Sequence, residues 1–336
     1  MAAEHIHSIT QRRLRVSAHM RELASQVNLS HKDFIQPLFV DQSLAAHQAI
    51  DSLKGVNTET IESACRQIEH DLQQGITKFL LFPIPLQYTS SENKNTILDF
   101  SFAIQAIETI KWEFGNDIWL SADCCLCSYT KDGHCGVISA DGESIDNPAS
   151  VKIISDYALA LAEAGADNIA PSDMMDGRIG AIREKLDKEK HDGVSIMSYS
   201  AKFSSQWYGP FRDICHSAPS GKISNRKSYQ LSPLNPADAI RCAERDAKEG
   251  ADIIMVKPAG WYTDIISQIR PLVNLPVAAY HVSGEYAAIE LMAEKNWINR
   301  QSAHTELWSA LKRSGADIII SYASRNAAQW IKEMEY

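Results

Sequence analysis

The segment SADCCLCSYTKDGHCG (121–136) contains four of the seven cysteines of the chain and a histidine. Disulfide bonds, a metal site and simple burial of thiols are the three interpretations of this clustering. No apolar secretory segment is visible near the start, so we expect a reducing compartment in which thiols stay free. Cys125, Cys127 and Cys135 follow a C-x-C-x7-C pattern, and three thiolates can bind Zn²⁺ while leaving a fourth position open for water or substrate. A structural site would need a fourth protein ligand, for which His134 is the candidate.

Two lysines each follow an apolar run typical of a buried strand: Lys202 in VSIMSYSAKF and Lys257 in ADIIMVKPAG. Burial and a second nearby cation both disfavour the ammonium form, so they lower the pKa of a lysine toward neutrality. A neutral amine can attack a ketone and form a Schiff base. The two runs are expected to be neighbouring strands, so the two lysines could share one pocket. The competing interpretation is two ordinary lysines that extend their ammonium groups to solvent.

The elements that must position these residues are short apolar runs separated by helix-like segments. Three runs follow the same junction, in which a helix-like segment ends at Gly and Ala-Asp leads into the run. These junctions lie in residues 162–173, 247–258 and 312–323. The other five runs are residues 33–40, 77–84, 117–123, 194–200 and 275–282. One intervening helix, NPASVKIISDYALALAEAG, is expected to have Asn147 as its N-cap and Pro148 in its first turn.

Eight nearly continuous apolar strands that alternate with helices predict an α/β fold with a parallel sheet covered by helices. For a chain of 336 residues, we expect a closed (β/α)8 TIM barrel. No linker composition divides the chain, so residues 31–336 are predicted to form a single catalytic barrel, preceded by an N-terminal extended arm over residues 1–30. An open doubly wound sheet is the alternative, but no Gly-rich fingerprint follows the first strand.

Charge and hydropathy limit the partners of the protein. The net charge of −9 and the pI of about 5.7 argue against a nucleic-acid or anionic membrane surface, and no apolar run is long enough to span a bilayer. The N-terminus is basic, with Arg12, Arg13, Arg15 and Arg21. We expect a protruding arm on a cytoplasmic protein, with an organellar transit peptide as the alternative.

Barrels of this kind place their chemistry at the carboxyl ends of the strands. Besides the cysteines and lysines, the reactive residues at these ends are Asp123, Ser283 and Tyr322. The segment 207–230 lies between the fifth and sixth strands, and its length and its basic, Gly/Ser/Pro-rich composition suit a lid. Within it, Arg212 and Arg226 can bind a substrate carboxylate through paired N–H groups. The competing interpretation is a solvated basic loop.

The segment GADIIMVKPAGWY (250–262) resembles the active-site signature of the porphobilinogen synthase family, also called the 5-aminolevulinate dehydratases. The similarity extends over nearly the whole chain. Further matching motifs are APSDMMDGR, SYSAKF, YGPFRD, RKSYQL, AYHVSGEYA and DCCLCSYTKDGHCGV. The resemblance implies a TIM barrel whose N-terminal arm embraces a neighbouring subunit, commonly in a homo-octamer. It also implies the condensation of two molecules of 5-aminolevulinate into porphobilinogen, the pyrrole precursor of tetrapyrroles such as heme.

The resemblance assigns roles to the reactive residues. Lys257 would form a Schiff base with the substrate that supplies the propionate side of the product, and Lys202 with the substrate that supplies the acetate side. Asp123 would assist proton transfer or steer the lysine pair. The zinc ligands of the zinc-dependent branch of the family match Cys125, Cys127 and Cys135, where the metal polarises or orients the second substrate.

The resemblance also assigns the residues that bind the substrate carboxylates. Ser283 and Tyr322 match those that hydrogen-bond the carboxylate of one substrate. Arg212, Arg226 and Gln230 match those that hold the other under the lid.

Three positions depart from the family pattern. Cys124 adds a thiol where a different small residue is common. This thiol either has no functional role or competes for the metal. Asn225 stands where an Asp often precedes the lid arginine. Cys242 stands where bacterial and plant relatives have the glutamate that holds an allosteric Mg²⁺, so we predict that this magnesium site is absent.

Two other functions are compatible with parts of the sequence. A class I aldolase-like Schiff-base lyase would use one lysine, and it would leave the cysteine loop unexplained. A zinc-binding assembly protein without catalysis would keep the cysteines and have no use for the lysine pair.

Overall fold

Eight parallel strands form a closed barrel in the computed structural model, which describes residues 11–86, 98–215 and 217–334. The strands are β1 (Phe34–Asp41), β4 (Lys78–Ile84), β5 (Trp119–Cys124), β8 (Asn168–Pro171), β9 (Ser195–Lys202), β10 (Ile253–Lys257), β11 (Val277–His281) and β12 (Ile318–Ser321). Each pairs with the next in this order, and β12 returns to β1, where Phe34 lies opposite Ile319. The predicted barrel is therefore confirmed, and the open sheet is wrong because its outer strands pair with each other.

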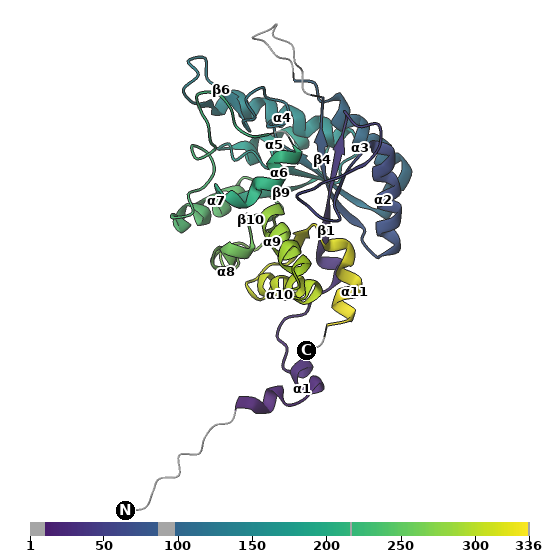
Figure 1. Cartoon of the computed structure of the whole chain (residues 1–336). Helices are drawn as coiled ribbons and strands as arrows, with labels where there is room; N and C mark the ends of the chain where they lie inside the picture. Colours follow the sequence, from purple (N-terminus) through teal and green to yellow (C-terminus); the bar gives the residue numbers. More distant parts are fainter. Residues whose placement is uncertain (1–10, 87–97, 216, 335–336) are drawn as a thin grey trace, which may run out of the picture.

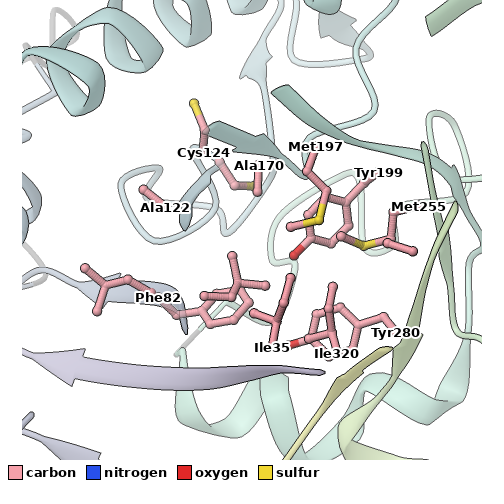
Figure 2. Close-up of a cluster of buried hydrophobic side chains, with 14 of the residues drawn as sticks. Ile35, Phe82, Ala122, Cys124, Ala170, Met197, Tyr199, Met255, Tyr280 and Ile320 are labelled. Carbon is pink, nitrogen blue, oxygen red and sulfur yellow. The ribbon is translucent and has the colours of Figure 1, made fainter. Parts of the chain in front are cut away.

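One hydrophobic core fills the barrel, with contributions from every strand. Figure 2 shows Phe82 of β4, Tyr199 of β9 and Tyr280 of β11 pointing toward one another. Tyr199 and Tyr280 are completely buried, with ring centroids 6.3 Å apart. Cys124, at the end of β5, directs its sulfur away from this group (Figure 2), toward the carbonyl oxygen of Ile154 at 3.7 Å. The interior is packed with side chains, so chemistry is confined to the carboxyl ends of the strands.

Helices follow the strands and surround the barrel (Figure 1). They are α2 (Ile61–Gln73), α3 (Ser101–Phe114), α4 (Asn147–Glu163), α5 (Arg178–Lys188), α6 (Gly209–Ile214), α7 (Pro236–Lys248), α8 (Thr263–Ile269), α9 (Ser283–Glu294), α10 (Arg300–Arg313) and α11 (Ala327–Lys332). Short 3-10 helices are η2 (His31–Asp33), η3 (Gly115–Asp117), η4 (Gln206–Tyr208), η5 (Gly260–Tyr262) and η6 (Ser324–Asn326). Of these, η4 and α6 lie in the segment predicted to be a lid, whose residue 216 is outside the described ranges.

The start of α4 corrects one prediction. Its N-cap is Asp146, whose side chain accepts a hydrogen bond from the backbone N–H of Ala149 at 3.0 Å, so the prediction of Asn147 is wrong by one residue. Both residue types cap helices well. Asp146 also ends β7 (Ile145–Asp146), which forms a hairpin with β6 (Val137–Ile138), and this pairing fixes where the helix begins. Pro148 lies in the first turn, as predicted.

The segment before the barrel stands away from it (Figure 1). It contains η1 (Gln11–Arg15) and α1 (Ala18–Leu23), and Leu14, Val16 and Leu23 are 57%, 74% and 81% exposed. Residues 1–10 of the predicted arm lie outside the described residues, and the contact of this arm with a second subunit stays a prediction. Two minor strands, β2 (Gln48–Ala49) and β3 (Asn57–Glu59), extend the sheet beside β1. No helix in the described ranges has the length and apolar composition needed to cross a bilayer.

Candidate active site

Lys202 and Lys257 lie opposite each other at the carboxyl ends of the neighbouring strands β9 and β10. The pairing depends on an irregularity: between Ile254 and Val256 of β10, strand β9 carries one extra residue. Such a bulge re-aims the side chains that follow it. As a result, the Lys202 nitrogen lies on the same side of β9 as the ring of Tyr199, 5.4 Å from its centroid.

Lys257 has an amine that is uncharged for much of the time at neutral pH. The side chain is 5% exposed, and its nitrogen lies 4.1 Å from the centroid of the Tyr280 ring and 4.9 Å from that of Tyr199. Burial, and next the positive charge of Lys202, lower its pKa to about 7, while Asp123 acts in the opposite direction. Aromatic faces favour the cation, but they do not replace the water that burial removes. This environment produces an amine nucleophile.

Asp123 and Ser172 complete the surroundings of the lysine pair. The Lys202 ammonium donates a hydrogen bond to the backbone carbonyl oxygen of Ser172, just beyond β8. Burial raises the pKa of Asp123 to about 6, although Lys202 and Lys257 both oppose this shift. Among the described residues, one carboxylate oxygen of Asp123 has no hydrogen-bond partner. A carboxyl group with this pKa, next to an amine, can exchange protons near neutral pH.

The three predicted thiol ligands lie together in the loop after β5. Their sulfur atoms are all within 4.8 Å of one another, and the residues are Cys125, Cys127 and Cys135. All seven cysteines are free, so the disulfide interpretation is wrong. Hydrogen bonds from Cys125 and Cys127, with the nearby charge of Arg226, hold the pKa of Cys135 well below its ordinary value. Three converging sulfurs with one favoured as thiolate form a donor set that suits a soft metal ion.

His134 does not join this group. Its Nδ1 lies 2.9 Å from the hydroxyl of Tyr229, and its Nε2 lies 2.7 Å from the backbone carbonyl oxygen of Ile223. Both ring nitrogens are therefore occupied by other partners. The metal-competent group consists of three thiols, as a site with an open fourth position requires.

The two predicted lid arginines extend from the segment after β9 toward the lysines and thiols. Arg226 is 6% exposed and donates hydrogen bonds to the carbonyl oxygens of Gly133 at 2.8 Å and Ser217 at 2.6 Å. Arg212 donates to the carbonyl oxygen of Ser205 at 3.0 Å. The buried, partnered Arg226 excludes the interpretation of a fully solvated loop.

A single small cavity brings most of these groups together. It is lined by Asp123, Cys127, Ser172, Lys202, Tyr208, Phe211, Arg212, Arg226 and Lys257. Its volume of about 20 Å³ is enough for a water molecule. The segment after β9 forms one wall of this cavity with Tyr208, Phe211, Arg212 and Arg226.

The sequence profile of the family described as "Delta-aminolevulinic acid dehydratase" matches residues 8–330. The chain belongs to the delta-aminolevulinic acid dehydratase family. It is 39% identical to the dehydratase of Bacillus subtilis (strain 168) over 322 residues, which cover 96% of this chain and 98% of the relative. It is 41% identical to that of Helicobacter pylori (strain J99), with the same shares of both chains covered.

A solved member of the dehydratase family has the same fold. It is the delta-aminolevulinic acid dehydratase (porphobilinogen synthase) from Toxoplasma gondii ME49, in complex with the reaction product porphobilinogen. The TM-score is 0.90 at 37% identity, covering 97% of this chain and 92% of that one. The resemblance found in the sequence motifs is thereby confirmed, and the family match disfavours both an aldolase-like lyase and a non-catalytic zinc protein.

Three residues predicted from the dehydratase motifs lie outside the lining of the small cavity. Ser283 accepts a hydrogen bond from the backbone N–H of Phe211 at 3.2 Å. The hydroxyl of Tyr322 lies 3.4 Å from that of Tyr280, inside the barrel. Gln230 is 3% exposed, and neither polar atom of its side chain has a hydrogen-bond partner in the described part of the chain. Such an unpartnered buried amide is poised to bind a group that enters.

Sequence reasoning did not single out Ser172, Tyr208 or Phe211 as site residues. Tyr208 donates a hydrogen bond to the carbonyl oxygen of Lys257 at 3.0 Å. The Phe211 ring centroid lies 5.1 Å from the Lys257 nitrogen. Ser172 contacts Lys202 through its backbone carbonyl oxygen, which a sequence motif does not reveal, although all three residues lie within the recognised motifs APSDMMDGR and YGPFRD.

Proposed function

We propose that this chain condenses two molecules of 5-aminolevulinate into porphobilinogen, with the loss of two water molecules, as a porphobilinogen synthase of the lyase class. The observation that carries the proposal is the register pairing of Lys202 with Lys257 in one cavity beside three converging thiols. Membership of the dehydratase family supports the same reaction. The product is an intermediate of tetrapyrrole, and hence heme, biosynthesis.

The two lysines would form Schiff bases with the two ketone substrates. Lys257, whose pKa is lowered to about 7, supplies a neutral amine to the substrate on the propionate side. Lys202 would form the Schiff base with the substrate on the acetate side. Conversion of a ketone into a protonated imine makes the adjacent carbon more acidic, which permits carbon–carbon bond formation. Asp123 accepts or returns protons at the lysine nitrogens, since it lies in the same cavity with a pKa of about 6.

The residues that would bind the substrate carboxylates fall into two groups. Arg212 and Arg226 supply positive charge at the cavity, and Gln230 supplies an unpartnered buried amide. Ser283 follows β11, the neighbour of β10, and Tyr322 follows β12, the strand beyond it, so their hydroxyls suit the substrate attached to Lys257. The hydrogen bond that the Ser283 hydroxyl donates to the Trp207 carbonyl oxygen at 3.4 Å would be exchanged for one donated to the carboxylate when the segment above moves.

Zn²⁺ is the metal that fits the three-cysteine group. Thiolates are soft ligands, and three of them leave one coordination position open. When bound, Zn²⁺ would polarise or orient the second substrate. Cys125, Cys127 and Cys135 would hold it, and Cys124 would not, because its sulfur faces the carbonyl oxygen of Ile154. An allosteric Mg²⁺ is not expected, since a thiol of Cys242 stands on α7 where an oxygen ligand would be needed.

We further propose a cytoplasmic homo-octamer in which the N-terminal arm contacts a neighbouring subunit. The free thiols suit a reducing compartment. Exposed apolar side chains on the segment before the barrel, at Leu14, Val16 and Leu23, suit a surface that a second subunit covers.

The test of the proposed function is a colorimetric pyrrole assay with 5-aminolevulinate, run with and without a chelator. The expected result is pyrrole formation that the chelator abolishes and added Zn²⁺ restores. Borohydride added with the substrate should attach the substrate, without its ketone oxygen, to Lys257, to Lys202 or to both. An enzyme that forms no pyrrole and is not modified by borohydride would overturn the proposal. Pyrrole formation that is unchanged by the chelator would contradict the proposed role of zinc but not the proposed reaction.

A further inference from the structure

Three consecutive residues, Ser283, Gly284 and Glu285, begin α9 after β11, and each contacts the backbone of a segment at the carboxyl ends of the strands. Ser283 accepts a hydrogen bond from Phe211 N–H at 3.2 Å. A Cβ atom at Gly284 would lie 2.6 Å from the carbonyl oxygen of Trp207, so no larger residue fits this approach. Both contacts join α9 to the segment that covers the cavity.

Glu285 makes the third contact, with the segment that follows Lys257. The side chain is 5% exposed. Its Oε1 accepts a hydrogen bond from Gly260 N–H at 3.0 Å, and its Oε2 accepts one from Val282 N–H at 2.9 Å. One carboxylate therefore joins the backbone three residues after Lys257 to the backbone one residue before Ser283. A Cβ atom at Gly260 would lie 2.9 Å from the Glu285 oxygen, so a larger residue there would displace the carboxylate.

The contact favours a carboxylate: burial raises the pKa of Glu285 to about 7, but the surrounding backbone N–H groups, including those of Val282 and Gly260, stabilise the charged form. Both partners of Glu285 are N–H donors, and a carboxylate offers an acceptor oxygen to each of them. A glutamine has one acceptor oxygen, so its NH₂ group would face one of the two N–H donors. Leaving a buried donor without an acceptor is costly, and the segment would move to relieve it.

We propose that Glu285 is a positioning residue that fixes the Lys257 amine relative to the Ser283 hydroxyl, so that the two can engage the ketone and the carboxylate of one substrate molecule together. This inference rests on the proposed function, in which Lys257 forms the Schiff base and Ser283 binds the carboxylate. Glu285 itself touches neither group, and it acts through the two backbone segments. Loss of Glu285 should therefore slow Schiff-base formation only for those ligands that engage both the Lys257 amine and the Ser283 hydroxyl.

The test compares two ketones in borohydride trapping at Lys257, located by peptide mass spectrometry. Levulinate (4-oxopentanoate) has a ketone and a carboxylate, whereas 2-butanone has the ketone alone. Glu285→Gln should slow levulinate trapping about 10-fold or more relative to wild type, with butanone trapping changed less than about 2-fold. Glu294→Gln is the matched control, because Glu294 ends the same helix but is exposed, with Lys54 at 3.6 Å; it should leave both rates unchanged.

A second variant approaches the same contact from its other side. Gly260→Ala would push the Glu285 oxygen away, so it should reproduce the selective loss of levulinate trapping even if Glu285→Gln does not fold. Equal slowing of both ketones, or no slowing of either, in whichever variant folds would overturn the inference. If neither variant folds, Glu285 is a structural residue and the inference is equally wrong. Failure of wild type to trap any ketone would instead count against the proposed function.

Discussion

Lys202 and Lys257 are register partners on adjacent parallel strands, and both nitrogens lie over the ring of Tyr199, 5.4 and 4.9 Å from its centroid. Burial, and next the repulsion between two ammonium groups this close, lower the pKa of Lys257. The pairing therefore links the strand geometry directly to amine reactivity, and the following predictions depend on it.

Replacement of either lysine should separate a two-lysine mechanism from an aldolase-like one. Lys257→Met should reduce pyrrole formation by about 10⁴-fold or more, as expected for loss of a nucleophile, while circular dichroism shows an intact fold. Lys202→Ala should also abolish pyrrole formation, because the second substrate loses its attachment. Substantial turnover by Lys202→Ala would favour an aldolase-like use of one lysine.

The pH dependence of Schiff-base trapping should report the pKa of Lys257. The neutral amine is the reactive form, so the rate of levulinate trapping should rise about tenfold per pH unit below pH 7 and level off above it. Lys202→Met removes a positive charge and should move the midpoint upward, and Asp123→Asn removes a negative charge and should move it downward. A midpoint near 10.5, the ordinary value for lysine, would contradict this picture.

Zinc binding should depend on the thiols of Cys125, Cys127 and Cys135 and not on that of Cys124. Cys125→Ser or Cys135→Ser should lower the zinc content measured by atomic emission from about one ion per subunit to nearly none, with a parallel loss of pyrrole formation. Cys124→Ser is the control, because the Cys124 sulfur faces the Ile154 carbonyl oxygen at 3.7 Å. Loss of zinc from the Cys124 variant would mean that it belongs to the metal site.

Magnesium should not stimulate the zinc-loaded enzyme. Mg²⁺ requires oxygen ligands, and burial raises the pKa of the Cys242 thiol, so this residue stays uncharged at neutral pH. The check is the initial rate of pyrrole formation at saturating Zn²⁺ as Mg²⁺ is added. Clear activation by millimolar Mg²⁺ would show that an allosteric site exists elsewhere on the chain.

Removal of residues 1–24 should produce smaller assemblies while leaving the barrel folded. The deletion spares Leu29, which packs against the core, and removes the exposed Leu14, Val16 and Leu23. Light scattering coupled to size-exclusion chromatography measures the mass of the assembly directly. An unchanged mass would show that the arm makes no contribution to assembly.

Much of the fold follows from local sequence patterns. The three Gly-Ala-Asp junctions and five further apolar runs correspond to the eight barrel strands. The ends of those strands also located Asp123 and both lysines, because parallel strands place their carboxyl ends on one side.

The rest depends on contacts between distant segments. The bulge that turns Lys202 toward Lys257 arises from pairing with β10, so no local pattern in β9 predicts it. His134 is withdrawn from the thiols by Tyr229 and Ile223, which are remote in sequence. The choice of Asp146 over Asn147 as N-cap depends on the neighbouring hairpin.

The closing pair of the barrel has a consequence for synthesis of the protein. Phe34 pairs with Ile319, so the cylinder stays open until the segment around Ile319 has left the ribosome. The thiols at 125–135, by contrast, all belong to one short loop. A nascent chain can thus bring these thiols together long before the cylinder around them is complete, and a metal ion bound there would cross-link the loop while the later strands are still being translated.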